Sequence, residues 1–181
     1  MTIAVTTPTG HVGSHVVRML CRAGVRPRLL LRNRDGLAAE VRDHVELAVG
    51  DQRDADYVAD ATRGPEAVFW VHPADFSLPD PDADAGRTAE GLAAAMRQNW
   101  IARVVFQSSI GAEMRHGAGF VDGLTRIEQR LDAARGDPHR AAASALWLVH
   151  DQSAHGPRRA ARRAADHHPA TGCADAVGRP A

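Results

Sequence analysis

The sequence contains no lysine: its 22 basic residues are all arginine, and 22 acidic residues balance them to a formal net charge of zero. It therefore lacks the global basic field that attracts nucleic acid or an anionic membrane, and we expect neither partner. Cysteine is nearly absent, and Cys21 and Cys173 lie too far apart in sequence to suggest a shared site. The His167–His168 pair near Cys173 fits no structural zinc spacing, so no metal site is predicted. A disulfide framework is not expected either, and a reducing cytoplasm is the expected compartment.

Long apolar runs are also missing. No run approaches the ~20 residues that a membrane-spanning helix needs. The N-terminal segment has no basic stretch ahead of its apolar residues, so it does not resemble a signal peptide. With 44% hydrophobic and 24% charged residues among 181, the composition is that of a soluble globular protein of about one domain.

What the sequence does contain, over residues 1–135, is a regular alternation of short apolar runs and helix-like segments. Strands are expected at residues 2–6, 28–31, 45–49, 67–71 and 104–108. Helices are expected at residues 15–23, 35–43, 54–62 (capped by Asp54), 86–98 and 122–134. A loop is expected at residues 77–84, which contain two prolines. Buried apolar runs separated by helices are typical of βαβ units, so the predicted fold is α/β, a doubly wound, Rossmann-like parallel sheet.

The composition changes at Gly136. Residues 136–181 contain no Ile, Phe, Met, Glu or Asn and are rich in Ala, Arg, His, Gly and Pro. A helix in this segment would have no apolar stripe beyond alanine, and it would bury too little apolar surface to offset its ordering entropy. We therefore divide the chain into a Rossmann-like α/β domain at residues 1–135 and an Ala/Arg-rich tail at residues 136–181, expected to be disordered.

A second interpretation of this tail is a change of reading frame. Residues 145–159, read one nucleotide over with free choice of synonymous codons, can encode Arg-Cys-Gly-Trp-Phe-Met-Thr-Asn-Leu-Leu-Met-Asp-Leu-Asp. This string is amphipathic, whereas the printed tail is not. The hypothesis places a frame change between Gly136 and Ser144, which would leave the C-terminal part of the fold truncated or aberrant; sequencing the gene tests it.

The strongest candidate site is TTPTGHVG, residues 6–13, directly after the first expected strand. A strand, a glycine-containing turn and a helix start form the setting of a dinucleotide fingerprint, because pyrophosphate needs close backbone approach and helix N–H groups. Thr7 stands where the first glycine is usual, and with Pro8 it is expected to weaken binding. The alternative is a plain strand–turn–helix with incidental glycines. The expected cofactor contacts are Thr9, Gly10, His11, Val12 and Gly13.

Arg32 and Arg34 follow the second strand, where an NAD-specific site carries an acidic residue for the ribose 2′-hydroxyl. A guanidinium suits a 2′-phosphate instead, so NADP(H) is predicted to be preferred over NAD(H). The alternative is a pair of solvated arginines on a loop.

Polar residues also end the other three strands. Asp51 is predicted to contact the adenine side of the dinucleotide; the alternative is that it caps a helix or stabilises a turn. His72 is predicted to lie beside the pyrophosphate and nicotinamide ribose; the alternative is an ordinary exposed loop histidine. Ser108 and Ser109 are placed near the nicotinamide, or else they satisfy the strand's own backbone. His116 lies in a glycine-rich loop that can border a substrate pocket. The catalytic residues stay unknown, with Ser109 and His116 as the candidates.

In order, TTPTGHVGSHV, LLLRNRD, VGD, AVFWVHP and RVVFQSSIGAEMRHGAGFVDGLTRIEQRL resemble the NmrA-like branch of the atypical short-chain dehydrogenases, over about residues 1–135. The shifted-frame string also resembles the segment after the last helix in that family. The resemblance implies a Rossmann fold that binds NAD(P), with a smaller C-terminal subdomain over the pocket. It implies a phosphate loop at Gly10–Gly13, a 2′-phosphate contact at Arg32, and residues near the nicotinamide at Ser108 and Ser109.

The Tyr-x-x-x-Lys pair of ordinary short-chain dehydrogenases is missing, since there is no lysine and the single tyrosine, Tyr57, lies elsewhere. Protonation of a carbonyl by that pair is excluded, whereas hydride transfer from the cofactor to a quinone or enone is not. The expected function is an NAD(P)H-binding reductase of a small electrophile such as a quinone. The alternatives are a non-catalytic dinucleotide sensor that acts through a protein partner, and a truncated product without stable function. The oligomeric state is left open.

Overall fold

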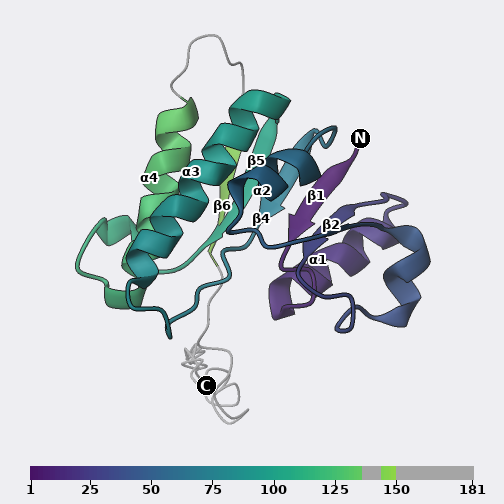
Figure 1. The fold of residues 1–181 in the computed structure, drawn as a ribbon, viewed down its shortest axis with the longest axis horizontal. Helices are drawn as coiled ribbons and strands as arrows, with labels where there is room; N and C mark the ends of the chain where they lie inside the picture. The colour runs from purple at the N-terminus through teal and green to yellow at the C-terminus, as the bar shows by residue number, and fades with distance from the viewer. Residues whose placement is uncertain (136–143, 150–181) are drawn as a thin grey trace, which may run out of the picture. The chain divides into compact units, whose positions relative to one another are not determined.

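A computed structural model describes residues 1–135 and 144–149 of the chain. Six strands form one sheet in the order β3-β2-β1-β4-β5-β6, and every neighbouring pair is parallel (Figure 1). The strands are β1 Ile3–Thr6, β2 Arg28–Leu31, β3 Glu46–Val49, β4 Ala67–Trp70, β5 Arg103–Ser108 and β6 Ser144–Val149. The predicted doubly wound parallel sheet is therefore confirmed.

Helices cover both faces of the sheet, as the unbroken apolar strands require. On one face, α1 (His11–Arg22) and the 3₁₀ helix η1 (Ala39–His44) pack over a core that includes Val5, Leu29 and Phe69. On the other face, α2 (Ala55–Ala61), α3 (Pro81–Asn99) and α4 (Asp122–Arg135) pack over Trp70 and Phe106, which are fully buried. Two further 3₁₀ turns, η2 (Ala112–Met114) and η3 (Gly119–Val121), lie in the connection from β5 to α4.

The strand order reverses between β1 and β4. From β1 the chain runs outward through β2 and β3, and from β4 it runs outward in the opposite direction through β5 and β6. In an open parallel sheet, the connections leaving such a point diverge and open a crevice at the carboxyl ends of the strands. The loops that follow β1 to β5 therefore define where a ligand binds.

Helix starts differ most from the sequence-based expectation. The helix predicted from residue 15 begins at His11, because the N–H of Ser14 already bonds to the carbonyl of Gly10 at 2.9 Å. The loop predicted at residues 77–84 is wrong in its second half, since α3 begins at Pro81, with Asp80 accepting from the N–H of Ala83 at 2.8 Å. Proline at the first helical position loses no hydrogen bond, which explains why it starts this helix rather than breaking it.

Of two other helix predictions, one was right about the cap of its helix and one was wrong about the type and start of its helix. The helix expected at residues 35–43 is the 3₁₀ helix η1 and starts at Ala39, after a turn in which Asn33 accepts from the N–H of Asp35 at 3.0 Å. The predicted cap of α2 is present, because Asp54 Oδ1 accepts from the N–H groups of Asp56 and Tyr57.

Strand β6 was not predicted. It lies at residues 144–149, inside the expected tail, and pairs with β5 along its whole length, from Arg103 opposite Ser144 to Ser108 opposite Val149. The frame-change hypothesis stays a prediction, which sequencing the gene tests. The division of the chain at residue 135 otherwise stays a prediction, since residues 136–143 and 150–181 lie outside the described ones.

Candidate dinucleotide-binding site

The loop after β1 makes a tight turn, with a threonine in a conformation that favours glycine. Thr7 has φ +50°, and its carbonyl accepts from the N–H of Gly10 at 3.1 Å. A β-branched residue in the left-handed region is strained. The Thr7 hydroxyl offsets part of this strain by donating to the carbonyl of Val71, beyond β4, at 3.1 Å. The Cβ at position 7 is therefore accommodated in the turn.

Gly13 is where the loop tolerates no side chain. A Cβ on Gly13 would lie 2.1 Å from the carbonyl oxygen of Thr7, whereas one on Gly10 would lie 3.2 Å from the Thr7 methyl group. The third glycine of the fingerprint thus lets α1 approach the end of β1 closely, as a dinucleotide loop requires. Gly10 is the N-cap of α1, and His11, Val12 and Gly13 lie in its first turn, whereas the sequence placed the helix start at residue 15; their contact with a cofactor stays a prediction.

The N-terminus of α1 is suited to an anion. Its first turn holds no acidic residue and Gly10 offers no capping side chain, whereas α2 and α3 are capped by Asp54 and Asp80. Uncapped N–H groups and the positive end of the helix dipole favour a phosphate. The cradle closed by Gly13 and this uncapped helix end fit the pyrophosphate of a dinucleotide.

A cavity of about 210 Å³ lies beside this loop, at the carboxyl ends of β1, β2 and β3. Of the predicted contacts, Thr9, Arg32 and Asp51 line it. The others are not among its lining residues: Gly10, His11, Val12, Gly13, Arg34, His72 and Ser108. Arg32 is exposed at the cavity wall, directly after β2. The full lining is Thr7, Pro8, Thr9, Leu30, Leu31, Arg32, Asn33, Gly36, Gly50, Asp51, Gln52 and Pro73. This is the end of the crevice where the adenosine half of a dinucleotide binds in a Rossmann fold.

Two buried polar side chains, one from the end of β1 and one from the loop after β3, bind the residue that follows β4 at the switch point. Thr6 Oγ1 accepts from the N–H of Val71 at 2.7 Å, and the amide of Gln52 donates to the carbonyl of Val71 at 3.0 Å. Both Thr6 and Gln52 are buried. They hold the floor of the crevice in place.

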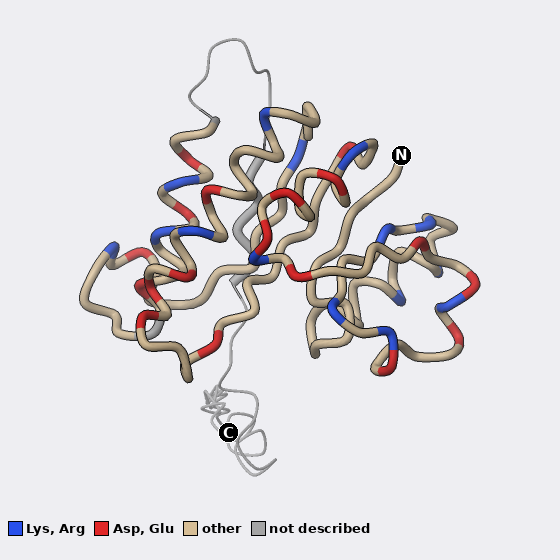
Figure 2. The backbone as a smooth tube through the Cα atoms, in the orientation of Figure 1, with Lys and Arg blue, Asp and Glu red and all other residues tan. Residues whose placement is uncertain are grey.

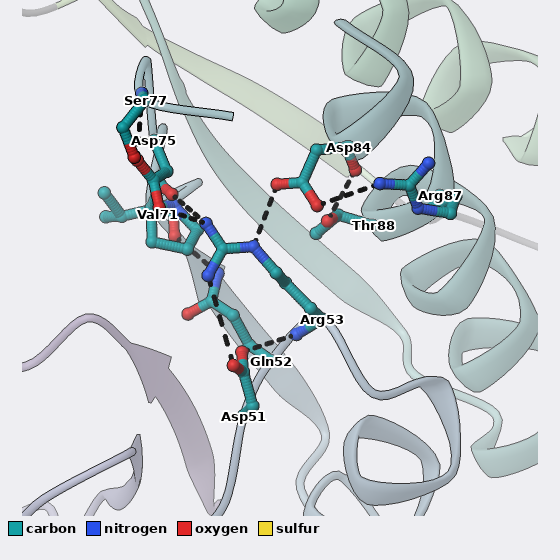
Figure 3. A network of polar contacts seen from close by, with 10 residues as sticks. Asp51, Gln52, Arg53, Val71, Asp75, Ser77, Asp84, Arg87 and Thr88 are labelled. Atoms are coloured by element: carbon teal, nitrogen blue, oxygen red, sulfur yellow. Dashed lines mark hydrogen bonds and ion pairs between the residues drawn. The ribbon is translucent and has the colours of Figure 1, made fainter. Parts of the chain in front are cut away.

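Arg53, in the loop after β3, is linked to helix α3 through Asp84 (Figure 3). Its guanidinium donates to Asp84 Oδ2 at 2.9 Å and to the carbonyl of Pro73 at 3.2 Å, with Asp75 and Asp51 at 3.8 and 4.0 Å. The hydrogen bond to Asp84 is the main cause that raises the pKa of Arg53. Asp51, besides lining the cavity, accepts from the N–H of Arg53 at 3.0 Å, so both predicted uses of this residue are compatible with its position.

His72 is held as a neutral imidazole. It is half-buried, and burial is the main cause that lowers its pKa from 6.5 to about 4. The negative charge of nearby Asp84 raises this pKa, and the positive charge of Arg53 lowers it further. Within residues 1–135 and 144–149, its Nδ1 is buried and has no hydrogen-bond partner. It does not line the cavity beside the phosphate loop.

The end of β5 carries a second polar cluster, which we call the Ser108–Glu128–Arg115 chain. Ser108 donates a short hydrogen bond to Glu128 Oε1, and Arg115 Nη1 lies 3.5 Å from Glu128 Oε2. Ser108 and Glu128 are 3% and 8% exposed, so this carboxylate is largely removed from water. Ser109, the next residue along the chain from Ser108, is half-buried. His116 is exposed on the loop between η2 and η3.

Tyr57 serves the scaffold. Its hydroxyl donates to the carbonyl of Ala48 at 2.6 Å, and burial raises its pKa to about 12. Its ring lies where a Cβ on Gly50 would be, with Cδ2 2.4 Å from that position. The side chain therefore stabilises the end of β3 and is not available to protonate a substrate.

The sequence analysis did not single out five polar residues that the structure places in these hydrogen-bond and ion-pair networks: Gln52, Arg53, Asp84, Arg115 and Glu128. One signal was available for Glu128: it occupies the apolar stripe of α4 formed by Leu124, Ile127 and Leu131, where a charged residue needs a partner. Asp84 gave no such signal, because its partner lies 31 residues away on another element.

Some classes of site are absent from the part of the chain that the structure describes. No group of three potential metal-binding side chains occurs there, and no helix is both long and apolar enough to cross a membrane. Arginine and acidic residues are interspersed along the backbone (Figure 2).

Comparisons with known proteins agree with this geometry. Sterol demethylase protein B of Methylococcus capsulatus is 36% identical over 118 residues, which cover 62% of this chain and 35% of that protein. The NADPH complex of the NADPH-dependent quinone oxidoreductase of Escherichia coli superposes with a TM-score of 0.61 at 15% identity, covering 81% of this chain and 47% of the other. A nucleoside-diphosphate-sugar epimerase of Staphylococcus aureus superposes with a TM-score of 0.68 at 17% identity, covering 82% and 50%. The chain thus spans about a third of the curated relative and about half of these structures.

A family model described as NAD(P)H-binding matches residues 8–146, from the phosphate loop into β6. The NAD(P)-binding Rossmann fold implied by the resemblance to the NmrA-like, atypical short-chain dehydrogenases is confirmed. The chain belongs to the NAD(P)H-binding family of Rossmann-fold proteins.

Proposed function

We propose that this chain binds NADPH in preference to NADH and is the cofactor-binding part of a reductase of a small apolar electrophile such as a quinone. The observation that carries the cofactor preference is Arg32, which stands exposed on the cavity directly after β2. An NAD-specific site has an acidic residue there, and a guanidinium instead pairs with a 2′-phosphate. The N-terminus of α1 would hold the pyrophosphate, and Thr9 and Asp51 would line the adenosine end.

The bound dinucleotide would supply hydride chemistry, and the protein would supply binding and orientation. An apolar substrate is supported by Phe76, Ile110 and Met114, three large side chains that are more than half exposed and follow β4 and β5 at the carboxyl edge. The names of two similar proteins, a quinone oxidoreductase and a sterol demethylase protein, also refer to apolar ring compounds.

Titration of the purified chain with NADPH and with NADH, followed by fluorescence, tests the cofactor preference. We expect NADPH to bind more tightly, and Arg32→Gln to weaken NADPH binding about 10- to 100-fold while leaving NADH unchanged, because a charge-assisted hydrogen bond contributes about 1.5–3 kcal/mol. Arg22→Gln, at the far end of α1, is the matched control. Equal loss of both dinucleotides in the Arg32 variant would contradict the assignment.

A second candidate is a dinucleotide sensor without turnover, acting through a protein partner. It is favoured by the position of Tyr57, the single tyrosine of a chain without lysine, whose hydroxyl is bound to the Ala48 carbonyl. NADPH oxidation in the presence of a quinone panel separates the two functions: turnover supports the reductase, and tight binding without turnover supports the sensor.

A further inference from the structure

We infer that Arg18, in the second turn of α1, is a second specificity-determining contact for the 2′-phosphate of the dinucleotide, in addition to Arg32. The inference rests on the proposed preference for NADPH. A phosphate monoester carries about −1.5 to −2 charges at pH 7, so a single guanidinium leaves part of this charge uncompensated. Arg34, the second arginine that the sequence predicted at this place, does not line the cavity beside the phosphate loop.

A second cavity, of about 120 Å³, lies between α1 and the segment that follows β2. It is lined by Pro8, Ser14, Val17, Arg18, Gly36, Leu37, Ala38 and Val41. Pro8 and Gly36 also line the larger cavity that Arg32 borders, so the two cavities share part of their wall. At this wall the segment after β2 passes directly against the phosphate loop, since a Cβ on Gly36 would lie 3.3 Å from Thr9 Cγ2.

Arg18 is the charged side chain of this second cavity. Ser14, the other polar residue of the lining, donates its hydroxyl to the carbonyl of His11 at 3.2 Å, and the remaining lining residues are apolar or glycine. Side chains on a helix lean toward its N-terminus, so Arg18 extends over Ser14 in the direction of the phosphate loop. Arg18 therefore approaches the shared wall from α1, and Arg32 approaches it from the end of β2.

Among the described residues, Arg18 has no partner that would explain its position. It is half-buried, and no hydrogen bond or ion pair within residues 1–135 and 144–149 reaches its guanidinium. The nearest carboxylate along the facing segment is that of Asp35, which accepts from the side-chain amide of Asn33 at 2.7 Å instead. A partly buried charge without a partner has lost hydration without a compensating contact, so a bound anion would stabilise it.

The 2′-phosphate is the anion that this position favours. The pyrophosphate is assigned to the N-terminus of α1, whereas the 2′-phosphate belongs to the adenosine ribose, beside the end of β2. A small free anion in the second cavity would meet the same guanidinium. The two sources are separable because 2′,5′-ADP contains the 2′-phosphate on the adenosine, whereas 5′-AMP lacks it.

The test is calorimetric titration of the purified chain with 2′,5′-ADP and 5′-AMP, and then with NADPH and NADH. We expect Arg18→Gln to weaken 2′,5′-ADP and NADPH about tenfold and to leave 5′-AMP and NADH unchanged, because it removes a charge-assisted hydrogen bond to the 2′-phosphate. Arg18→Lys, which keeps the charge, should retain part of the affinity. Arg22→Gln, one turn further along α1 and exposed, lines neither cavity and is the matched control.

Thermal unfolding without ligand separates this role from a structural one. We expect Arg18→Gln not to lower the unfolding temperature, because the charge that it removes has no partner among the described residues. A lower unfolding temperature with equal losses of NADPH and NADH would show a structural role and overturn the inference.

The remaining outcomes distinguish the inference from the proposed function. If Arg32→Gln removes the preference for NADPH and Arg18→Gln retains it, the inference is wrong and the proposed function stands; the same holds if a free anion alone occupies the second cavity, since 2′,5′-ADP would then bind equally to the parent and to Arg18→Gln. A parent chain that binds 2′,5′-ADP no more tightly than 5′-AMP would overturn both.

Discussion

Replacing Gly13 by alanine is predicted to damage both the fold and cofactor binding. The added Cβ would lie 2.1 Å from the Thr7 carbonyl oxygen, 2.8 Å from its carbonyl carbon and 3.1 Å from Pro8 Cα. All three are backbone atoms, so no side chain can rotate away. Relief requires the turn and α1 to separate by roughly 1 Å, as overpacked sites do at a cost of about 1–3 kcal/mol.

This cost falls on a loop that has little freedom to move. Thr7 is held by its hydrogen bond to Val71, and its carbonyl accepts from Gly10. For a protein of this size, a loss of about 1–3 kcal/mol corresponds to roughly 2–12 °C in the unfolding temperature. Displacing the N–H groups of α1 from the pyrophosphate should also weaken NADPH binding at least about tenfold, the equivalent of about 1.4 kcal/mol.

Differential scanning fluorimetry with and without NADPH measures both effects. Gly86→Ala is the matched control, because it lies inside helix α3 with nothing within 4 Å of the new Cβ. It should raise stability by about 0.5–1 kcal/mol, the usual preference of a helix for alanine over glycine. A Gly13→Ala protein with the parent's stability and NADPH affinity would refute the close approach of α1 to β1.

Two further predictions concern the polar groups behind the cavity. Asp84→Asn removes one partner of the Arg53–Asp84 pair, in which the aspartate is 4% exposed, and should lower the free energy of unfolding in urea by about 2–4 kcal/mol. Asp60→Asn, in the exposed Asp60–Arg63 pair, is the control and should lower it by less than about 1 kcal/mol. Equal losses in the two variants would show that Arg53 is not a structural anchor. The pKa of His72 is about 4 in the folded protein and 6.5 ordinarily, so between these pH values the unfolded chain binds more protons than the folded protein. The contribution of the neutral His72 to the free energy of unfolding is therefore complete above about pH 6.5, and up to about 3 kcal/mol of it is lost as the pH falls to 4. His72→Gln should remove that part of the acid sensitivity, and parallel stability–pH curves for the two proteins would contradict the buried neutral imidazole.

Local features of the fold were predictable from the sequence. The run Arg28–Leu31 is bounded by turn residues and is β2 to the residue, and the Asp54 cap sits where a capping side chain precedes a helical pattern. The tight turn between β1 and α1 was recognisable because its two glycines follow a strand and open a helix. In each case the determining interactions lie within a few residues along the chain.

Features that depend on distant partners were not predictable in the same way. Strand β6 has a tail-like composition on both sides, and its place in the sheet comes from pairing with β5. The sequence did not show how a threonine is tolerated where a glycine is usual; in the structure, the hydrogen bond from Thr7 to the Val71 carbonyl holds it in the left-handed conformation. The Arg53–Asp84 pair and the Ser108–Glu128–Arg115 chain join elements whose proximity only the tertiary fold creates.

The central place of β1 has a consequence for how the protein forms. Its two neighbours in the sheet are β2 and β4, and the bonds that join its end to the end of β4 span 65 residues of chain. During synthesis, β1 can pair early with β2 but must wait for β4 to emerge, so its second edge stays open in the meantime. Because such long-range closures slow folding, the nascent β1–β3 half is the stage at which this chain is most exposed to misassembly and to chaperones.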